Sequence, residues 1–242
     1  TGSVTLNGGT LGGYGTLAGT VVAGSAPHTI APSATLASTA AGTLTVPSLA
    51  TNINTTLAFN LTTPGASSVN DAIKVTANGG LTLTGGKVKI ANPPAGPASL
   101  GYYKILQYAG TIQGAGPSSL LLPPVQNNIA YTLDTTHDPN FIDLHKGFLG
   151  DANDDGLVNF SDFVLLSNHF GQSATGWSGA DFNNDNITNF SDFVTLSNNF
   201  GQSTGASDLA AASSPSSVPE PAALPLFALA ALPLLRRRGR AG

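Results

Sequence analysis

The stretch that organises this chain reads Asp151-Ala-Asn-Asp-Asp-Gly-Leu-Val-Asn-Phe-Ser-Asp162. Thirty residues later it returns as Asp181-Phe-Asn-Asn-Asp-Asn-Ile-Thr-Asn-Phe-Ser-Asp192. Extended to Ser173 and Ser203, the two copies are identical at 16 of 23 positions. A repeat this close is one structural unit used twice, so both copies are expected to share one fold and one chemistry.

The first copy places oxygen-bearing side chains at alternate positions of a twelve-residue loop. Positions 1, 3, 5, 7, 9 and 12 are Asp151, Asn153, Asp155, Leu157 (through its backbone carbonyl), Asn159 and Asp162. This is the ligand order of an EF-hand calcium loop, because a hard cation takes six to eight oxygen ligands. No His or Cys takes part, which disfavours a softer metal such as zinc.

The second copy offers the same donors but departs from the first at other positions. The corresponding positions are Asp181, Asn183, Asp185, Ile187 (carbonyl), Asn189 and Asp192. At position 6, Asn186 replaces Gly156, and the loop must turn there with a positive φ. Asn tolerates that region better than other side chains do, but at some cost. Thr188 also replaces the apolar Val158. From both changes we expect two Ca²⁺ sites, of which the second is the weaker.

The alternative for both copies is that the Asp and Asn residues are only solvated turn formers. Two copies in register, each followed by the same pattern, disfavour that interpretation. Charge agrees with calcium, because residues 150–202 contain seven Asp and no Lys or Arg. Without bound cations such a segment would repel itself.

After each loop the apolar residues follow a helical period. The same spacing occurs twice, in Phe163, Leu166 and Phe170 and again in Phe193, Leu196 and Phe200. This predicts a helix of about two turns that ends at Gly171 or Gly201. The sequence shows no convincing helix before either loop.

Two loop–helix units about 30 residues apart, with Asp at position 12, resemble a type I dockerin over Gly150 to about Gly201. The resemblance implies that the twelve loop residues above are calcium ligands and that the module folds around its calcium. It also implies docking onto a cohesin domain of a partner. The partner-reading positions would be loop positions 10 and 11, here Phe160, Ser161, Phe190 and Ser191. The same pair in both copies implies binding in two orientations.

Composition limits the remaining functions. Only 9% of the 242 residues are charged, there is no Cys or Met, and the net charge is −4. Missing Cys excludes disulfides and thiol catalysis. The charge divides into +1 for residues 1–149, −7 for residues 150–202 and +2 for the remainder, which does not favour nucleic-acid binding. The first residue, Thr1, is neither Met nor part of a signal peptide, so we expect a C-terminal piece of a longer precursor.

Residues 1–149 read as short strands separated by Gly, Pro, Asn and Ser, which predicts an all-β region, either sandwich or solenoid. The predicted strands span residues 4–6, 15–17, 43–46, 56–61, 72–75, 80–84, 87–90, 102–108, 130–133 and 141–144. The stretch Leu6 to Leu17, Leu-Asn-Gly-Gly-Thr-Leu-Gly-Gly-Tyr-Gly-Thr-Leu, resembles the autotransporter-associated repeat. That resemblance implies a right-handed β-solenoid over 1–57. Residues 58–149 resemble the segment that closes such repeats, and a solenoid needs a cap. The expected fold class is mainly β, a solenoid-like region followed by a small α calcium module.

Catalytic residues are sparse, and we assign none. Five polar residues lie close in sequence: Asp134, His137, Asp138, Asp143 and His145. They could form a metal site or an acid/base pair, but a polar loop around a hairpin is the more common meaning of such a group. Tyr102, Tyr103 and Tyr108 could stack on sugar rings, although strand aromatics more often fill a core.

The C-terminal residues read as a linker over 203–217 and a targeting tail over 218–242. The tail joins Val218-Pro-Glu-Pro221, an apolar run over 222–235 and Arg236-Arg-Arg-Gly-Arg240. A helix of that run would be about 21 Å long, short of the roughly 30 Å of a bilayer core. The order resembles a PEP-CTERM sorting signal, which implies that an exosortase recognises Pro219, Glu220 and Pro221. It implies transient membrane contact and export to the surface of a Gram-negative-type bacterium that makes extracellular polysaccharide.

The sequence therefore favours a structural or adhesive surface protein with a docking module, and an extracellular polysaccharide as a possible ligand. The alternative is a glycoside hydrolase, lyase or accessory component of polysaccharide degradation, docked through the same module. A third interpretation keeps the module as a calcium-stiffened spacer without a cohesin.

Overall fold

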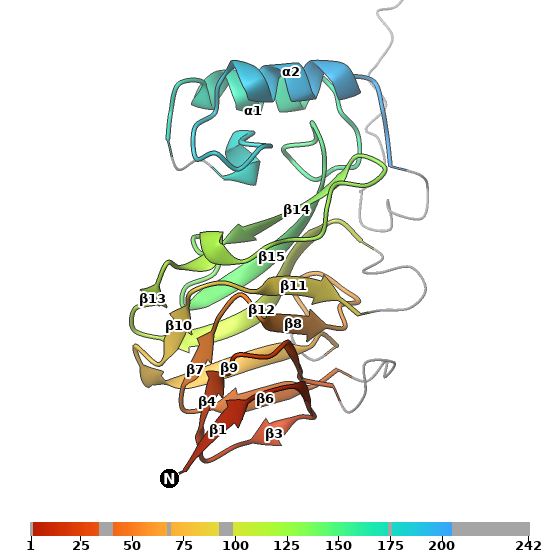
Figure 1. Cartoon of the computed structure of the whole chain (residues 1–242). Helices are drawn as coiled ribbons and strands as arrows, with labels where there is room; N and C mark the ends of the chain where they lie inside the picture. The colour runs from red at the N-terminus through yellow and green to blue at the C-terminus, as the bar shows by residue number, and fades with distance from the viewer. Residues whose placement is uncertain (1, 34–40, 67–68, 92–98, 174–175, 205–242) are drawn as a thin grey trace, which may run out of the picture. The chain divides into compact units, whose positions relative to one another are not determined.

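The computed structural model describes residues 2–33, 41–66, 69–91, 99–173 and 176–204 (Figure 1). The expected sorting tail, with Pro219, Glu220 and Pro221, lies outside these residues, as does the linker from 205 onward. The described chain is mainly β, with strands through residue 148 and two α-helices after it. Neither of these helices is long and apolar enough to cross a membrane.

The strands form three sheets. The first contains β1 (Ser3–Leu6), β4 (Thr20–Ala23), β7 (Leu49–Thr51), β10 (Leu81–Leu83) and β13 (Gln113–Gly114). The second contains β2 (Gly9–Gly12), β5 (His28–Ala31), β8 (Thr55–Phe59) and β11 (Lys87–Ile90). The third runs in the order β3 (Gly15–Thr16), β6 (Thr43–Val46), β9 (Ala72–Asn78), β12 (Gly101–Ala109), β15 (Phe141–Phe148) and β14 (Ile129–Asp134).

Consecutive strands from β1 to β13 go to the three sheets in turn. Within each sheet the neighbours are three strands apart in the chain, and they pair in parallel. The third sheet ends differently, because β15 pairs antiparallel with both β12 and β14. All three sheets are open, with β1 and β13, β2 and β11, and β3 and β14 as their edge strands.

Buried aliphatic side chains in register hold the sheets together. Each sheet has one such row: Val21, Leu49 and Leu81 in the first, Ile30, Leu57 and Val88 in the second, Leu44, Ile73 and Leu106 in the third. All nine are buried and belong to one hydrophobic core. Burial of this kind contributes about 1.5–3 kcal/mol per side chain, so these rows stabilise strands too short to be stable alone.

Sequence analysis located most long strands but missed several short ones. The missed strands are β2, β4, β5, β7 and β13. They contain two to four residues, and β2 and β13 are rich in Gly, so their strand character comes from pairing with neighbouring strands rather than from their own pattern. The expected division between residues 57 and 58 falls inside β8 (Thr55–Phe59).

Strand β15 connects the sheets to the helical part of the chain. It is buried along almost its whole length, and only three residues separate its end from Ala152. Its last residue, Phe148, belongs to a second hydrophobic core together with Val158, Leu166 and Leu196. The hydrophobic core of the helical module that follows therefore includes a residue of the β-sheet.

Candidate calcium sites

Each predicted loop ends inside the first turn of a helix. Helix α1 spans Phe160–His169 and α2 spans Phe190–Asn199. Asn159 is the N-cap of α1: its side-chain Oδ1 accepts a hydrogen bond from Ser161 N at 2.7 Å, and its own N–H donates to Asp162 Oδ2 at 2.8 Å. Asn189 and Asp192 repeat this capping box at α2. The candidate ligands at loop positions 9 and 12 are therefore also the N-cap and N3 residues of the helix that follows.

The helices differ in detail from the predicted ones. They start three residues before Phe163 and Phe193, because the loops supply the N-caps. Phe170 and Phe200 were expected on the apolar face, and this was wrong: both follow the helix end and are more than half exposed. Leu166 and Leu196 are buried as expected.

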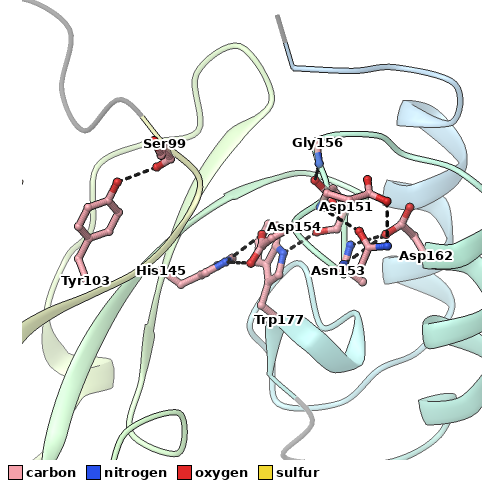
Figure 2. A network of polar contacts seen from close by, with 11 residues as sticks. Ser99, Tyr103, His145, Asp151, Asn153, Asp154, Gly156, Asp162 and Trp177 are labelled. Carbon is pink, nitrogen blue, oxygen red and sulfur yellow. Dashed lines mark hydrogen bonds and ion pairs between the residues drawn. The ribbon is translucent and has the colours of Figure 1, made fainter. Parts of the chain in front are cut away.

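The first loop, residues 151–162, folds the carboxylates of Asp151 and Asp162 inward (Figure 2). Asp151 is fully buried and accepts hydrogen bonds from the N–H groups of Asp155 at 3.1 Å and Gly156 at 2.8 Å. Asp162, at the other end of the loop, is also fully buried and accepts from Ala152 N at 2.9 Å. Backbone donors therefore fix both side chains. The two Asp151 oxygens accept one hydrogen bond each, as does Asp162 Oδ2, so these three oxygens keep a lone pair for a further ligand.

The intermediate positions follow the same rule. Asn153 Oδ1 accepts from Asp155 N at 3.0 Å, and Asp155 Oδ1 accepts from Leu157 N at 2.8 Å. Each of these side-chain oxygens thus accepts a hydrogen bond from the backbone N–H two residues later in the loop. This Asx-turn pattern directs alternate side chains to the same side of the loop.

The second loop, residues 181–192, repeats these contacts. Asp181 accepts from Asp185 N at 3.2 Å and Asn186 N at 2.9 Å. Asp192 accepts from Phe182 N at 2.8 Å and Asn189 N at 2.9 Å. Asn183 and Asp185 also repeat the turns of their counterparts. All twelve predicted ligands therefore lie in two loops with one hydrogen-bond pattern.

Position 6 adopts the predicted left-handed backbone in both loops, with φ +82° at Gly156 and +72° at Asn186. Gly156 is buried, whereas Asn186 is exposed. Position 4 is also left-handed, with φ +56° at both Asp154 and Asn184. Sequence analysis missed this second turn, although Asp and Asn are the residues that most often adopt it.

The two units hold each other through their loops. Leu157 in the first loop forms an antiparallel bridge with Ser203, after α2, and Ile187 in the second loop forms one with Ser173, after α1. Ser173 and Ser203 occupy equivalent positions in the two copies and make equivalent bridges. The module is therefore one structure built from both repeats.

Buried carboxyl groups make the loops sites for a cation. Burial raises the pKa of Asp151 to about 7, opposed by the hydrogen bond from Gly156 and reinforced by Asp154, Asp162 and Asp155. Burial likewise raises the pKa of Asp162 and of Asp181. A divalent cation bound to all-oxygen donors would relieve this repulsion, and Ca²⁺ fits such a donor set.

The first loop is also tied to the β-sheet (Figure 2). His145 of β15 is buried, and its Nε2 lies 2.8 Å from Asp154 Oδ2. Trp177 Nε1 donates to the carbonyl oxygen of Asp151 at 2.7 Å, and its ring lies 4.8 Å from the His145 ring. Sequence analysis missed this contact, because Trp177 lies between the two loops and no local pattern connects it to Asp151 or His145.

The hairpin residues singled out in the sequence separate into different roles. Ligand atoms of His137, Asp138 and Asp143 lie within 4.8 Å of one another. Asp134 instead accepts from Thr136 N and His137 N, at 2.6 and 3.1 Å. His145 turns to the first calcium loop, as described above.

Tyr103, Tyr108 and His28 have structural roles. Tyr103 is fully buried, and its hydroxyl donates to Ser99 O at 2.7 Å. Tyr108 packs against the same core. His28 is buried, with Nε2 3.0 Å from Thr55 Oγ1. Tyr102 stacks on His137.

Two calcium-type loops, each leading into a helix and paired reciprocally, define a small module whose oxygen donors suit a hard cation. Residues 149–201 match the family model of the Dockerin type I domain. Dockerin type I domains bind calcium and dock onto cohesin partners, and they occur in extracellular or cell-surface proteins. No curated protein and no solved structure matches the chain.

We predict that Asp154→Asn destabilises the junction between β15 and the first loop without removing a calcium ligand. Loss of the charged partner of buried His145 should lower the free energy of unfolding by about 1–3 kcal/mol. Urea denaturation in saturating Ca²⁺ measures this. Asn184→Asp, at the equivalent exposed position of the second loop, is the matched control and should change stability by less than about 0.5 kcal/mol. Equal effects of the two substitutions would contradict a specific role for the His145 contact.

Proposed function

We propose that this chain is the structural or adhesive part of an exported bacterial surface protein and docks to a partner through its calcium-loaded module. The observation that carries the proposal is the pair of loops with convergent oxygen donors in a segment that matches the dockerin family. A folded loop brings its ligands together, so the binding free energy of Ca²⁺ would add to the stability of the folded state.

The proposed ligands of the first Ca²⁺ are Asp151, Asn153, Asp155, the carbonyl of Leu157, Asn159 and Asp162. Those of the second are Asp181, Asn183, Asp185, the carbonyl of Ile187, Asn189 and Asp192. The second site is proposed to be the weaker. Two differences support this ranking: Asn186 holds a left-handed conformation that glycine adopts without strain, and it is exposed where Gly156 is buried.

We predict that Asn186→Gly tightens the second Ca²⁺ site and that Gly156→Asn weakens the first. Relief or introduction of about 0.5–1 kcal/mol of backbone strain corresponds to a roughly two- to fivefold change in Kd. Calorimetric titration of the metal-free chain measures both sites. Asp181→Ala, which removes a ligand, identifies the second binding event by abolishing it. A single binding event in the unsubstituted chain would contradict the two-site proposal.

The proposed docking surface consists of loop positions 10 and 11, Phe160-Ser161 and Phe190-Ser191. Phe160 and Phe190 are each 67% exposed at the start of their helices. Both serines are exposed beside them. Exposed aromatic side chains are frequent anchors of protein interfaces, and an equivalent pair in each repeat supports two binding orientations.

We predict that Phe160→Ala and Phe190→Ala each leave cohesin binding within about threefold of the unsubstituted chain, since one intact orientation remains. The double substitution should weaken binding by at least about tenfold, which is more than 1.4 kcal/mol. Calorimetry with a type I cohesin panel in saturating Ca²⁺ is the measurement. Phe170→Ala, exposed at the far end of α1, is the control. Absence of binding to any cohesin would favour the calcium-stiffened spacer.

The β-region is proposed to be a solenoid over 1–57 with a closing cap over 58–149. Support comes from the parallel strand order, which advances by three strands in each sheet, and from the antiparallel β14–β15 hairpin at the end of the third. The linker and the exosortase-recognised tail, with export to the surface of a Gram-negative-type bacterium, rest on the sequence resemblance of Pro219, Glu220 and Pro221.

A second candidate function is binding of an acidic extracellular polysaccharide. A cleft of about 870 Å³ is lined by Lys87, Lys89 and Lys146, which are three of the chain's five lysines, and by Tyr131. Lys87 and Lys89 point to the same side of β11, since they are two residues apart on one strand. Cations beside an aromatic ring suit uronate-containing sugars. This supports an accessory role in polysaccharide binding.

We predict that Lys87→Gln/Lys89→Gln weakens binding of polygalacturonate by about tenfold, and that binding of the unsubstituted chain falls as salt is raised. Affinity electrophoresis in gels containing polygalacturonate or neutral dextran measures this. Lys74→Gln, at an exposed position on β9, is the matched control. Equal retardation by dextran and polygalacturonate would argue against charge recognition.

A further inference from the structure

The hairpin between β14 and β15 contains a buried carboxylate that lacks hydrogen bonds. Asp143 on β15 is fully buried, and within the described part of the chain neither of its carboxylate oxygens has a hydrogen-bond partner. A buried carboxylate in that state is costly unless a counterion or a metal compensates it. Its environment therefore points to a cationic ligand.

Asp71 shows how this protein satisfies a buried carboxylate that has only a structural role. It is as buried as Asp143, yet its oxygens accept hydrogen bonds from Gly42 N at 2.8 Å and Asn60 N at 2.8 Å. Asn60 Nδ2 adds a third at 3.1 Å. The contrast separates Asp143 from the ordinary polar interior of the chain.

Two further ligand atoms face Asp143 from the hairpin loop. His137 Nδ1 lies 3.5 Å from Asp143 Oδ2 and 3.2 Å from Asp138 Oδ2. Ligands around a tetrahedral zinc ion, with bonds of about 2.0–2.2 Å, lie roughly 3.3–3.5 Å apart. Both distances to His137 are therefore close to those that a shared metal ion requires.

The histidine is held in place by its neighbours. The His137 ring stacks on Tyr102 with centroids 3.8 Å apart and planes 6° from parallel. The loop backbone before it is fixed by Asp134, which accepts from His137 N. A ligand positioned in advance loses less conformational freedom when it binds a metal.

The ammonium group of Lys104 would compete with a metal ion for Asp138. Its Nζ lies 3.1 Å from Asp138 Oδ2 and 4.9 Å from the centroid of the Phe141 ring. Burial, together with Asp138, raises the pKa of Asp143 to about 6, while His137 and Lys104 oppose that rise. Lys104 thus neutralises Asp138 when no metal is bound, and a metal would have to displace it.

We propose that His137, Asp138 and Asp143 form a third metal site that takes a divalent first-row transition metal such as Zn²⁺. Its imidazole nitrogen distinguishes it from the two calcium loops, whose donors are all oxygens, because nitrogen ligands favour transition metals over Ca²⁺. The fourth coordination position is left to water or to a ligand from outside the chain. This site lies outside the dockerin-like module and is independent of the docking function.

The test is a Zn²⁺ titration of the full chain in saturating Ca²⁺, which occupies the calcium loops. One equivalent of Zn²⁺ should bind, and Co²⁺ in its place should show the visible absorption of tetrahedral coordination. His137→Ala, an exposed substitution that spares the fold, should weaken Zn²⁺ binding at least tenfold, as should Asp143→Asn. His169→Ala, which removes a histidine on α1, is the matched control and should leave affinity unchanged.

Lys104→Gln provides a prediction of opposite sign. Removal of the competing ammonium should tighten Zn²⁺ binding severalfold. Unchanged or weaker binding in this variant would remove Asp138 from the ligand set. Zn²⁺ affinity that is the same in His137→Ala as in the unsubstituted chain, or absence of Zn²⁺ binding at all, would overturn the site.

Discussion

The burial of carboxylates at both ends of each loop is the constraint on which the module depends. Asp151 and Asp162 are fully buried, and each is held by backbone N–H groups of its own loop. Seven Asp residues without a single Lys or Arg make this segment self-repelling. The hydrogen bonds orient the oxygens, and a bound cation would neutralise their charge, so the folding of the module and its binding of calcium are expected to be coupled.

The module is attached asymmetrically to the rest of the chain. Within the described residues, the first loop contacts β15 through the hydrogen bond between His145 and Asp154 and through Trp177, and the core of the module includes Phe148 of the same strand. The β-sheet thus supports one of two otherwise similar loops. The contacts of the first loop with β15 also stabilise the second unit, because the two units are paired through their loops.

Strand β15 also connects two different kinds of polar site. His145 faces the first calcium loop, whereas Asp143, two residues earlier on the same strand, faces His137 in the hairpin. Tyr102 contacts both histidines, with ring centroids 3.8 Å from His137 and 4.3 Å from His145. The close spacing of these residues in sequence suggested one group, but the structure divides them between two neighbouring sites.

The sequence by itself located the two twelve-residue loops and their candidate ligands, because the spacing of Asp and Asn and the turn at position 6 are local to each loop, and the second copy repeats them thirty residues later. It also predicted β structure for residues 1–149, and the described residues of that range are mainly β. Only the tertiary structure decided the three-sheet pairing, since the shortest strands become strands through neighbours about 30 residues away. It likewise decided the partners of His145, Trp177 and Asp143, because contacts between distant segments leave no periodic signal in the chain.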